Sequence, residues 1–437
     1  MTLGSIARAD AATGSRARRL AWEQADHILC VRLDNLGDVL MTTPAMRALK
    51  QARASRRLTL LGSGAGVRAA AFVPEIDATI RYEAPWVKNG RACASELDRT
   101  AIEVIAAHRF DAAVIFTAYS QSPIAAALLC LMAGIPLRLA HCRENPYLLL
   151  SDWVPETEPA QQVRHETQRQ LDLVSAVAPA PRDLRLSFSI PAHERASLAR
   201  KLAEAGIDPS GEYIVVHPGA SAPSRRYPAE RYAQAVRELA SCQPRPIVVT
   251  GGADEAPICA QVAAVHGVDP GVRAFDGVRR RAAMLDGMHR RVPTTSCTRV
   301  LDLAGCLTLG ELGALIEGAG VLVSNNTGPV HIAAALGTPV VDLYALTNPQ
   351  HRPWRVASRV LNRDVPCRNC YKSVCPNATQ ACLSGVPASE VVEATLELLD
   401  LRERAAVRIE RAPFAGRRSI ARKAADPGEA RPWSRGI

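Results

Sequence analysis

Residues 321–336, VLVSNNTGPVHIAAAL, decide the fold class, because they contain a complete strand, turn and helix. Val321–Ser324 is a short apolar run that is typical of a buried strand. Gly328–Leu336 begins with Gly-Pro, which suits the first turn of a helix. A strand that leads through a small polar turn into a helix is the repeating unit of a parallel α/β sheet.

The turn within this segment predicts an anion-binding site. The first backbone N–H groups of a helix have no partner inside the helix, so an anion can accept their hydrogen bonds. Thr327 adds a hydroxyl, and His331 lies on the first turn of the same helix. A histidine in an apolar helix is often a core residue, but its place beside such a turn favours a ligand contact. We therefore predict that Thr327, Gly328 and His331 contact a phosphate.

The same alternation of strand and helix occurs in both halves of the chain. Ile28–Leu33 and Ala112–Phe116 are apolar strands in the first half, and Tyr213–His217 and Pro339–Tyr344 are apolar strands in the second. Each is followed or preceded by a helical pattern, which predicts an α/β protein with doubly wound parallel sheets. The predicted organisation is a disordered segment 1–25, a domain 26–190, a second domain 191–400 and a basic tail 401–437.

The turn after the first strand carries two carboxylates. Asp34 and Asp38 follow Ile28–Leu33, and Gly37 permits a close backbone approach. An aspartate at a helix start often caps the helix. A carboxylate at the carboxyl end of a parallel strand, where ligands bind, could instead take a proton from a sugar hydroxyl. The residues alone leave both interpretations of Asp38 open.

Two turns of the second half add candidate donor contacts. Ser221 lies in the small-residue loop after Tyr213–His217, and Arg225 follows it with a second arginine that could help neutralise a diphosphate. Glu255 follows Gly251-Gly252 and could accept hydrogen bonds from a ribose. A helix cap is the alternative role of this acid.

Composition and charge restrict the class of protein. The chain has 437 residues, of which 48% are hydrophobic and 22% charged, so it is not a disordered chain. The net charge of +10 concentrates in two segments, 271–299 and 401–437. They predict contact with an anionic surface such as a phospholipid leaflet, or else a solvated loop and tail. Only 4% of residues are aromatic and no recognition motif occurs, so we expect no nucleic-acid partner.

The same sequence shows no targeting or membrane-spanning segment. It contains no apolar run of eighteen residues, and residues 1–23 lack the apolar core of a secretory signal. We therefore expect a cytoplasmic protein.

Four of the twelve cysteines gather near the end of the chain. Cys367, Cys370, Cys375 and Cys382 have the spacing C-x2-C-x4-C-x6-C. In a cytoplasmic protein this favours a structural zinc or an iron–sulfur site over disulfides. Free or paired thiols are the alternative, since the spacing is not that of a standard zinc finger or ferredoxin.

These segments together resemble glycosyltransferase family 9, the bacterial heptosyltransferases of lipopolysaccharide core assembly. The resemblance spans roughly residues 27–400. It rests on the order and spacing of the following segments: Arg32…Gly37-Asp38…Thr43-Pro44, His217-Pro218-Gly219, Arg226-Tyr227-Pro228, Gly251-Gly252, and Ser324…Thr327-Gly328-Pro329…His331.

The resemblance implies a GT-B fold with two Rossmann-like domains that face a cleft. It implies an inverting transfer without a metal, from a nucleotide sugar, usually ADP-heptose, to a lipid-linked core glycan at the inner membrane. By motif, Asp38 matches the base, and Ser221, Thr327, Gly328 and His331 match contacts to the donor phosphates.

Two positions depart from the family pattern. Arg225 stands where the family usually has lysine. Asn326 stands where the family has an aspartate that is thought to hold donor sugar hydroxyls, so Asn326 bears on the identity of the donor sugar.

Two other functions stay open at this point. A nucleotide-sugar epimerase of the same fold would need no lipid acceptor. A non-catalytic protein would use the cysteines and the basic segments to bind RNA or a membrane.

Overall fold

The computed structural model describes residues 16–87, 95–264, 270–271 and 298–410. The predicted basic insertion 271–299 and the tail 401–437 therefore lie mostly outside the described residues. The chain divides into a unit of residues 1–399 and a unit of residues 400–437, and the site described below belongs entirely to the first. In the described part of the chain, no helix combines the length and apolarity needed to cross a bilayer.

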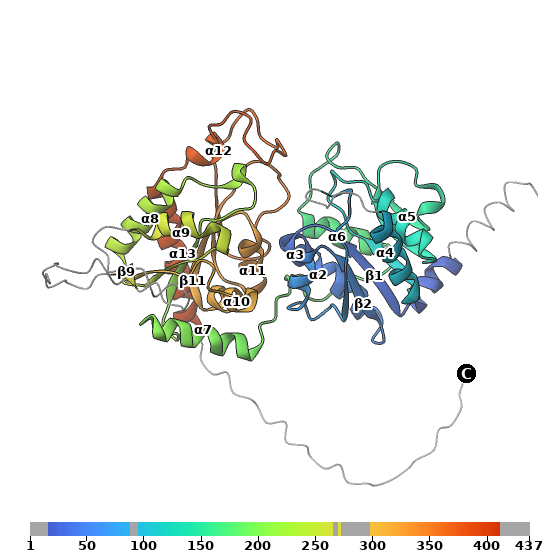
Figure 1. Ribbon diagram of the computed structural model, residues 1–437, viewed down its shortest axis with the longest axis horizontal. Coiled ribbons are helices and arrows are strands. Elements are labelled where there is room, and N and C mark those ends of the chain that lie inside the picture. The colour runs from blue at the N-terminus through green and yellow to red at the C-terminus, as the bar shows by residue number, and fades with distance from the viewer. Residues whose placement is uncertain (1–15, 88–94, 265–269, 272–297, 411–437) are drawn as a thin grey trace, which may run out of the picture. The chain divides into compact units, whose positions relative to one another are not determined.

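The first half forms a six-stranded parallel sheet in the order β3-β2-β1-β4-β5-β6, of which β1 and β2 are labelled in Figure 1. This order is that of a doubly wound nucleotide-binding sheet. Its elements are β1 His27–Arg32, α2 Leu36–Gln51, β2 Arg57–Gly62, α3 Gly64–Ala70, β3 Ala78–Arg81, α4 Ser95–Ala107, β4 Ala112–Ile115, α5 Ile124–Met132, β5 Leu137–Cys142, η1 Tyr147–Leu149, β6 Asp152–Pro155 and α6 Glu166–Val174.

The second half repeats this arrangement in the order β13-β12-β11-β7-β8-β10-β9. Its elements are α7 Ala192–Glu204, β7 Tyr213–His217, η2 Pro223–Arg225, α8 Ala229–Cys242, β8 Ile247–Val249, η3 Ala253–Glu255, α9 Ala256–Ala263, β9 Pro270–Gly271, β10 Val300–Asp302, α10 Leu309–Gly318, β11 Ala319–Asn325, α11 Gly328–Leu336, β12 Val340–Leu343, β13 Ser358–Leu361, α12 Ala381–Ser384 and α13 Ala388–Glu410. The predicted doubly wound parallel sheets are thus confirmed.

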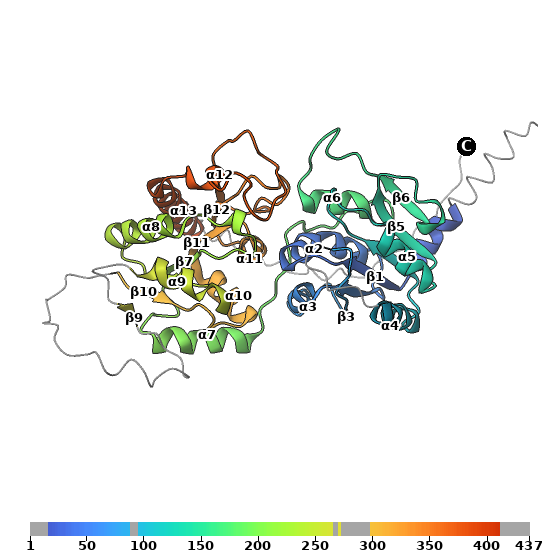
Figure 2. The same ribbon diagram turned by 45° about the horizontal axis from the view of Figure 1, so that its top comes forward.

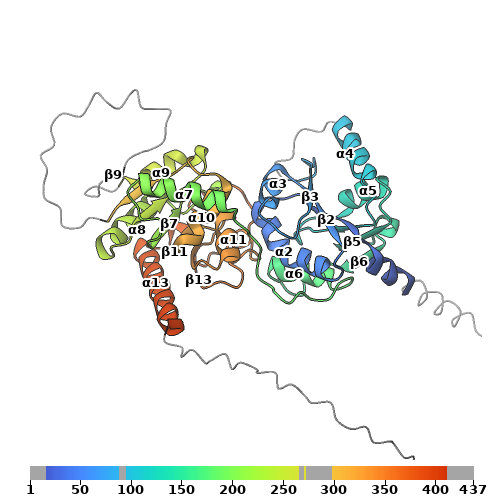
Figure 3. The same ribbon diagram turned by 90° about the horizontal axis from the view of Figure 1, so that it is seen from below.

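The buried apolar residues form four clusters, one on each face of each sheet. In β1, Ile28 and Cys30 pack towards α2, whereas Leu29 and Val31 pack on the side of α4 and α5. Figure 3 shows α2 and α6 on one face of this sheet and α4 and α5 on the other. This near-continuous apolar character of the strands follows from their burial on both faces.

The second sheet is covered in the same way. One cluster packs α8, α9 and α13 against the sheet, and the other packs α7, α10 and α11 (Figure 2). Ile214 and Val216 of β7 belong to the first cluster, and Tyr213 and Val215 belong to the second. The central strands of both sheets are therefore buried on both faces, whereas the edge strands β3 and β6 alternate between partly buried and exposed residues.

The prediction that residues 1–25 are disordered is wrong for residues 16–24, which form a helix. Trp22 on this helix is buried and donates from Nε1 to Asp152 Oδ2 at 2.9 Å. The buried guanidinium of Arg56 donates to the backbone carbonyls of Trp22 and Ala25. These contacts are made by residues far along the chain, so the local composition did not reveal them. Residues 1–15 lie outside the described residues.

The Thr43-Pro44 pair has a structural reason within α2. Pro44 lies inside this helix and has no N–H to donate to the carbonyl of Leu40. The hydroxyl of Thr43 donates to that carbonyl instead, at 2.7 Å. The threonine therefore supplies the hydrogen bond that the proline removes, and α2 continues to Gln51.

Candidate functional site

The site forms where the strand order of each sheet reverses. In the first sheet this point lies between β1 and β4, and in the second it lies between β7 and β11. Ligands of doubly wound sheets bind at this point, outside the carboxyl ends of the strands. The turns that carry Asp38 and His331 start at β1 and β11, so the topology places both predicted groups at such points.

Arg32, at the end of β1, is the charged centre of the first turn. Its side chain is 0% exposed and contacts three carboxylates: Asp34 Oδ2 at 3.2 Å, Asp38 Oδ1 at 3.0 Å and Glu166 Oε1 at 2.8 Å. Burial disfavours the guanidinium charge, but these carboxylates outweigh it and raise the pKa of Arg32. Arg32 therefore stays charged and fixes the positions of the acids around it.

Asp38 is ionised in this setting. Its Oδ1 accepts from Arg32, and its Oδ2 accepts from the backbone N–H of Asn35 at 3.1 Å. Burial would raise the pKa of Asp38, but the charge of Arg32 and the hydrogen bond from the N–H of Asn35 act to lower it, and the pKa lies below its ordinary value. The structure thus gives Asp38 the helix-cap contact that the sequence allowed, and leaves 15% of its side chain exposed.

Asp34 has the opposite electrostatic character. Burial raises its pKa to about 6, and the neighbouring charge of Asp38 acts in the same direction. Gln121, on the loop after β4, donates from Nε2 to Asp34 Oδ1 at 2.7 Å. Asp34 lines a cavity of about 500 Å³ with Trp86, Ser120, Gln121 and Ser122 over an apolar floor.

The start of α11 is left without a side-chain cap. Thr327 occupies the cap position, but its hydroxyl donates to the carbonyl of Asn325 at 3.2 Å and not to the helix. The predicted contacts Thr327 and Gly328 are both partly exposed. The positive end of this helix is therefore available to an anion.

The two turns approach each other closely at Gly37. A Cβ atom at this position would lie 2.6 Å from Cδ2 of His331, which is closer than real Cβ contacts come. Gly37 is thus needed for the imidazole of His331 to lie against the start of α2. This contact places His331 near Asp38.

Two buried imidazoles lie at this point. Burial lowers the pKa of His331 to about 3, and burial likewise lowers the pKa of His351. Their ring centroids are 6.4 Å apart, and His351 Nε2 lies 4.0 Å from Asp38 Oδ1. At neutral pH both imidazoles are uncharged.

Asn326 is tied to the protein interior. Its Nδ2 donates to Asp342 Oδ2 at 3.0 Å and to the carbonyl of His351 at 2.8 Å. Burial raises the pKa of Asp342 to about 8. The amide donors of Asn326 are thus used within the fold, and its carbonyl oxygen is what can still meet a ligand.

The other predicted donor contacts lie on the loops after β7 and β8. Arg225 ends η2, and its charge lowers the pKa values of His331 and His351. Ser221 is exposed on the same loop. Glu255 Oε2 lies 3.7 Å from His217 Nε2 and accepts from the N–H of Gly252, which is the helix-cap role named as its alternative.

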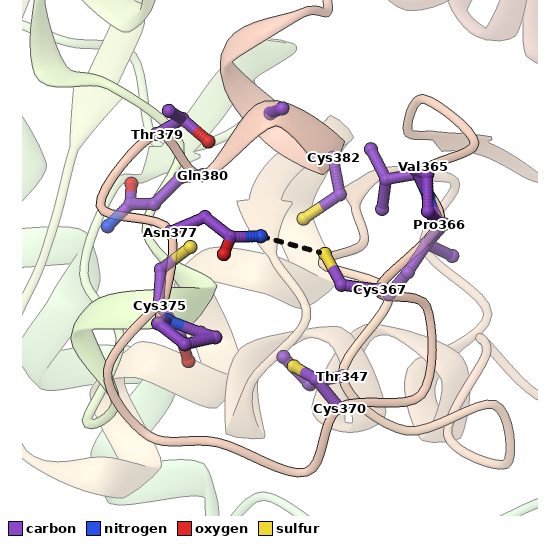
Figure 4. Close-up of a pocket in the computed structure, with 14 residues that line it drawn as sticks. Thr347, Val365, Pro366, Cys367, Cys370, Cys375, Asn377, Thr379, Gln380 and Cys382 are labelled. Carbon is purple, nitrogen blue, oxygen red and sulfur yellow. Dashed lines mark hydrogen bonds between the residues drawn. The ribbon is translucent and has the colours of Figure 1, made fainter.

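The four clustered cysteines line one cavity of about 180 Å³ (Figure 4). All four are free, and Asn377 Nδ2 lies 3.6 Å from Cys367 Sγ. Among the residues that the structure describes, no three His, Cys, Asp or Glu side chains are grouped so that they could hold a metal ion.

The segment that carries these cysteines is hydrogen-bonded to η2. Ser224 donates its N–H to the carbonyl of Ser373 and its hydroxyl to that of Lys372, and Gln380 donates to the carbonyl of Pro223. The cysteine segment therefore supports the loop that carries Arg225.

Sequence reasoning missed three residues of the site as functional candidates. Arg32 was included in a motif without being given a role. An arginine at the end of an apolar strand, followed by two aspartates, would have indicated a buried ion pair. Glu166 and His351 reach Asp38 from 128 and 313 positions along the chain, so no spacing pattern connects them. Only the tertiary structure brings them to the same point.

Comparisons with known proteins identify similar sequences and similar folds. Residues 279–380 match the family "Glycosyltransferase family 9 (heptosyltransferase)". The chain is 25% identical to the lipopolysaccharide heptosyltransferase 3 of Escherichia coli over 374 residues, which covers 83% of this chain and 96% of that protein. It is 22% identical to a putative glycosyltransferase of Haemophilus influenzae, over 76% of this chain and 86% of the other.

Two solved structures share the fold. A family 9 glycosyl transferase from Veillonella parvula superposes with a TM-score of 0.64 at 19% identity and covers 86% of this chain and 97% of that one. The E. coli ADP-heptose lipopolysaccharide heptosyltransferase II superposes with a TM-score of 0.62 at 20% identity, over 86% and 99%. The fold is the GT-B fold, as the resemblance implied, and this chain is a glycosyltransferase whose residues 279–380 match family 9, the heptosyltransferase family.

Proposed function

We propose that this enzyme transfers a heptose from ADP-heptose to a sugar hydroxyl of a lipid-linked core glycan, with inversion at the anomeric carbon. The observation that carries the proposal is the ionised Asp38 carboxylate, which Arg32 holds beside the open start of α11. Such a transfer requires a base for the acceptor hydroxyl and a site that binds the anionic diphosphate. Asp38 and the start of α11 would supply these two groups side by side. Family membership favours this transferase over the epimerase and the non-catalytic binding protein.

In the proposed reaction, Asp38 removes the proton of the acceptor hydroxyl. The acceptor oxygen forms a bond to the anomeric carbon while the bond from that carbon to the diphosphate oxygen breaks. The proton goes to Asp38, and the electron pair of the broken bond goes to the diphosphate. The lowered pKa of Asp38 keeps it able to receive this proton at neutral pH.

The start of α11 suits the diphosphate of the donor. Pro329 has no N–H, and the N–H of Val330 donates to the carbonyl of Thr327. The N–H of Gly328 and the positive end of the helix dipole would therefore stabilise the negative charge that grows on the leaving group. Arg225 adds a cation near His331 and His351, and Ser221 adds a hydroxyl on the same loop. Asn326 would offer its carbonyl oxygen to the donor, and Glu255 is the candidate ribose contact.

The cavity beside Asp34 suits the acceptor. It lies at the ends of β1 and β4, and Asp34 shares Arg32 with Asp38. Trp86, 40% exposed, offers an aromatic face, while Ser120, Gln121 and Ser122 offer hydrogen bonds to hydroxyl groups. A sugar presents these same two kinds of surface.

The names of the relatives support the donor. The solved relative above is an ADP-heptose transferase, and the full-length E. coli relative is a lipopolysaccharide heptosyltransferase. Asn326 replaces the family aspartate, so the test includes other nucleotide sugars beside ADP-heptose.

The test measures ADP release from ADP-heptose in the presence of a heptose-deficient core lipid. Wild-type protein should release ADP only with acceptor, and Asp38→Asn should lower the rate by about 10² to 10⁴-fold. Asp208→Asn, at an exposed turn away from the site, is the matched control and should keep the wild-type rate. An Asp38→Asn variant as fast as wild type would overturn the role of Asp38, and release with another nucleotide sugar alone would overturn the choice of donor.

A lipid-linked acceptor would bring the enzyme to the cytoplasmic face of the inner membrane. We propose peripheral contact through the basic residues 412–437, which lie outside the described residues. Deletion of this tail should reduce the protein recovered with membranes, and unchanged fractionation would contradict the contact.

For the cysteine cluster, we propose a structural zinc or iron–sulfur site, with no part in the transfer itself. The shared cavity of the four thiols supports it, although their side chains would have to move closer together to bind a metal. Metal analysis of the purified protein, compared with Cys375→Ser, tests it. Four thiols that react freely in metal-free wild-type protein would contradict it.

A further inference from the structure

His351 has a ring nitrogen that the fold leaves open beside the proposed base. Its Nε2 lies 4.0 Å from Asp38 Oδ1 and is buried without a hydrogen-bond partner among the described residues. A buried polar atom without a partner is costly, and such atoms are kept where they have a role. The carboxylate that lies 4.0 Å from this nitrogen is the one that would carry the transferred proton.

The backbone N–H and the backbone carbonyl of His351 are both hydrogen-bonded. Its N–H donates to the hydroxyl of Tyr344 at 3.2 Å, and its carbonyl accepts from Asn326 Nδ2 at 2.8 Å. The side chain of this residue therefore starts from a backbone that cannot easily turn away from Asp38.

The neighbouring residues are held as well. The carbonyl of Gln350 accepts from the N–H of Glu166 at 3.1 Å, and the carbonyl of Arg352 lies 2.8 Å from Nε2 of His165. Because Glu166 also binds Arg32, these contacts connect the 350–352 segment to the network around Asp38. These four contacts orient the segment 350–352, and the unpartnered Nε2 of His351 lies on the side of Asp38.

Charged and titratable groups surround His351 from every neighbouring element. The groups that face it come from β1, α2, α6, η2 and α11: Arg32, Asp38, His165, Glu166, Arg225 and His331. Burial lowers the pKa of His351, whereas Asp38 and Glu166 act to raise it. The imidazole is therefore neutral before the reaction and becomes easier to protonate when a carboxylate lies beside it.

We propose that His351 receives the transferred proton from Asp38 during the transfer, so that Asp38 is again ionised before the products leave. The inference rests on the proposed function of Asp38 as the base. The proton leaves the acceptor hydroxyl, passes to an Asp38 oxygen, and then binds the lone pair of His351 Nε2. No oxidant or further reactant is involved. The imidazolium that forms is paired with the Asp38 carboxylate and adds positive charge near the departing diphosphate.

The experiment compares the pH dependence of kcat for wild type and His351→Gln. In the wild type, the acid limb of kcat should report the protonation of His351, because a protonated imidazole cannot accept the proton. His351→Gln should lower the plateau by about tenfold to a hundredfold and move the acid limb to lower pH, where Asp38 alone titrates. The KM for the nucleotide sugar should stay near the wild-type value.

A control separates this role from a structural one. His27→Gln makes the same change at the opposite end of β1 from the site, at a partly buried histidine whose Nε2 lies 3.2 Å from Thr59 Oγ1. It should leave the acid limb in place. A His351→Gln variant with a lower plateau but an unmoved acid limb would overturn the proposal, since that is the result of a merely structural role.

A second measurement needs no substrate. The titration of His351, followed by NMR of labelled histidine, should shift to lower pH in Asp38→Asn, because that change removes a neighbouring carboxylate. An unmoved titration would mean that the two groups do not interact and would overturn the proposal. If Asp38→Asn keeps full transfer activity, the proposed function fails as well. If only the His351 results fail, the base remains and the proton transfer to His351 does not.

Discussion

The turn after β1 and the turn after β11 have the same local architecture, but the first is charged and the second is uncharged. Each leads from a buried parallel strand into a helix at the reversal point of its sheet. The first turn gathers one guanidinium and three carboxylates around Arg32. The second offers the amide of Asn326, the hydroxyl of Thr327 and the neutral imidazole of His331.

This difference suits each turn to the task that is proposed for it. Ionised acids suit the removal of a proton, and a buried arginine keeps them ionised and in place. An uncharged turn suits the binding of a diphosphate, because it presents the N–H of Gly328 and a helix dipole without a competing anion. The two turns meet at Gly37 and His331. Substitutions that change a charge or add a side-chain atom in either turn therefore test this comparison.

The largest effect is expected when the charged turn loses its cation. Arg32→Met removes the partner of three carboxylates and should cost about 3–5 kcal/mol of the free energy of unfolding at neutral pH. The loss should shrink towards pH 4, where the acids take up protons. Urea unfolding at several pH values measures it, with Arg68→Met at an exposed site as the control. An equal loss at all pH values would mean that the carboxylates are not the cause.

The next effect follows from placing an acid in the neutral turn. Asn326→Asp puts a carboxyl against Asp342, whose pKa is already raised to about 8 by burial. A group with a raised folded pKa stabilises the fold at low pH, and this stability is lost as pH rises from about 4 to about 8. The variant should therefore lose at least about 1–3 kcal/mol, and more at pH 8 than at pH 5.

A second substitution tests the cause of that loss. Asp342→Asn in the Asn326→Asp background restores one amide and one carboxyl to the pair. It should recover most of the lost stability and flatten the pH dependence of the thermal midpoint. If the double variant is no more stable than Asn326→Asp, repulsion between the two carboxyl groups is not the reason for the loss.

The smallest effect concerns the contact between the two turns. Gly37→Ala adds a Cβ that would lie 2.6 Å from His331, and forced shifts of this kind cost about 1–3 kcal/mol. His331→Ala removes the ring with which the new Cβ would clash. The losses in the free energy of unfolding of the two single variants, measured by chemical denaturation, should therefore not add up in the double variant. Additive effects would show that Gly37 and His331 do not press against each other in solution.

The sequence predicted the strands and helices that carry the site with small errors at their ends. Tyr213–His217 and Gly328–Leu336 match β7 and α11 residue for residue. These segments are predictable because their strands are buried on both faces and their helices begin with Gly-Pro or polar turns. The helix at residues 16–24 was missed because its stability comes from Asp152 and Arg56, not from its own residues.

The sequence by itself determined the fold class, the family and the candidate base, because these depend on short segments whose order and local chemistry are visible along the chain. The tertiary structure alone decided the surroundings of Asp38. Arg32, Glu166 and His351 meet there from separate parts of the chain, and their burial sets the charge of each group. The physical reason is that charge states depend on what lies within a few ångströms in space, and this is settled only when the strands and helices pack.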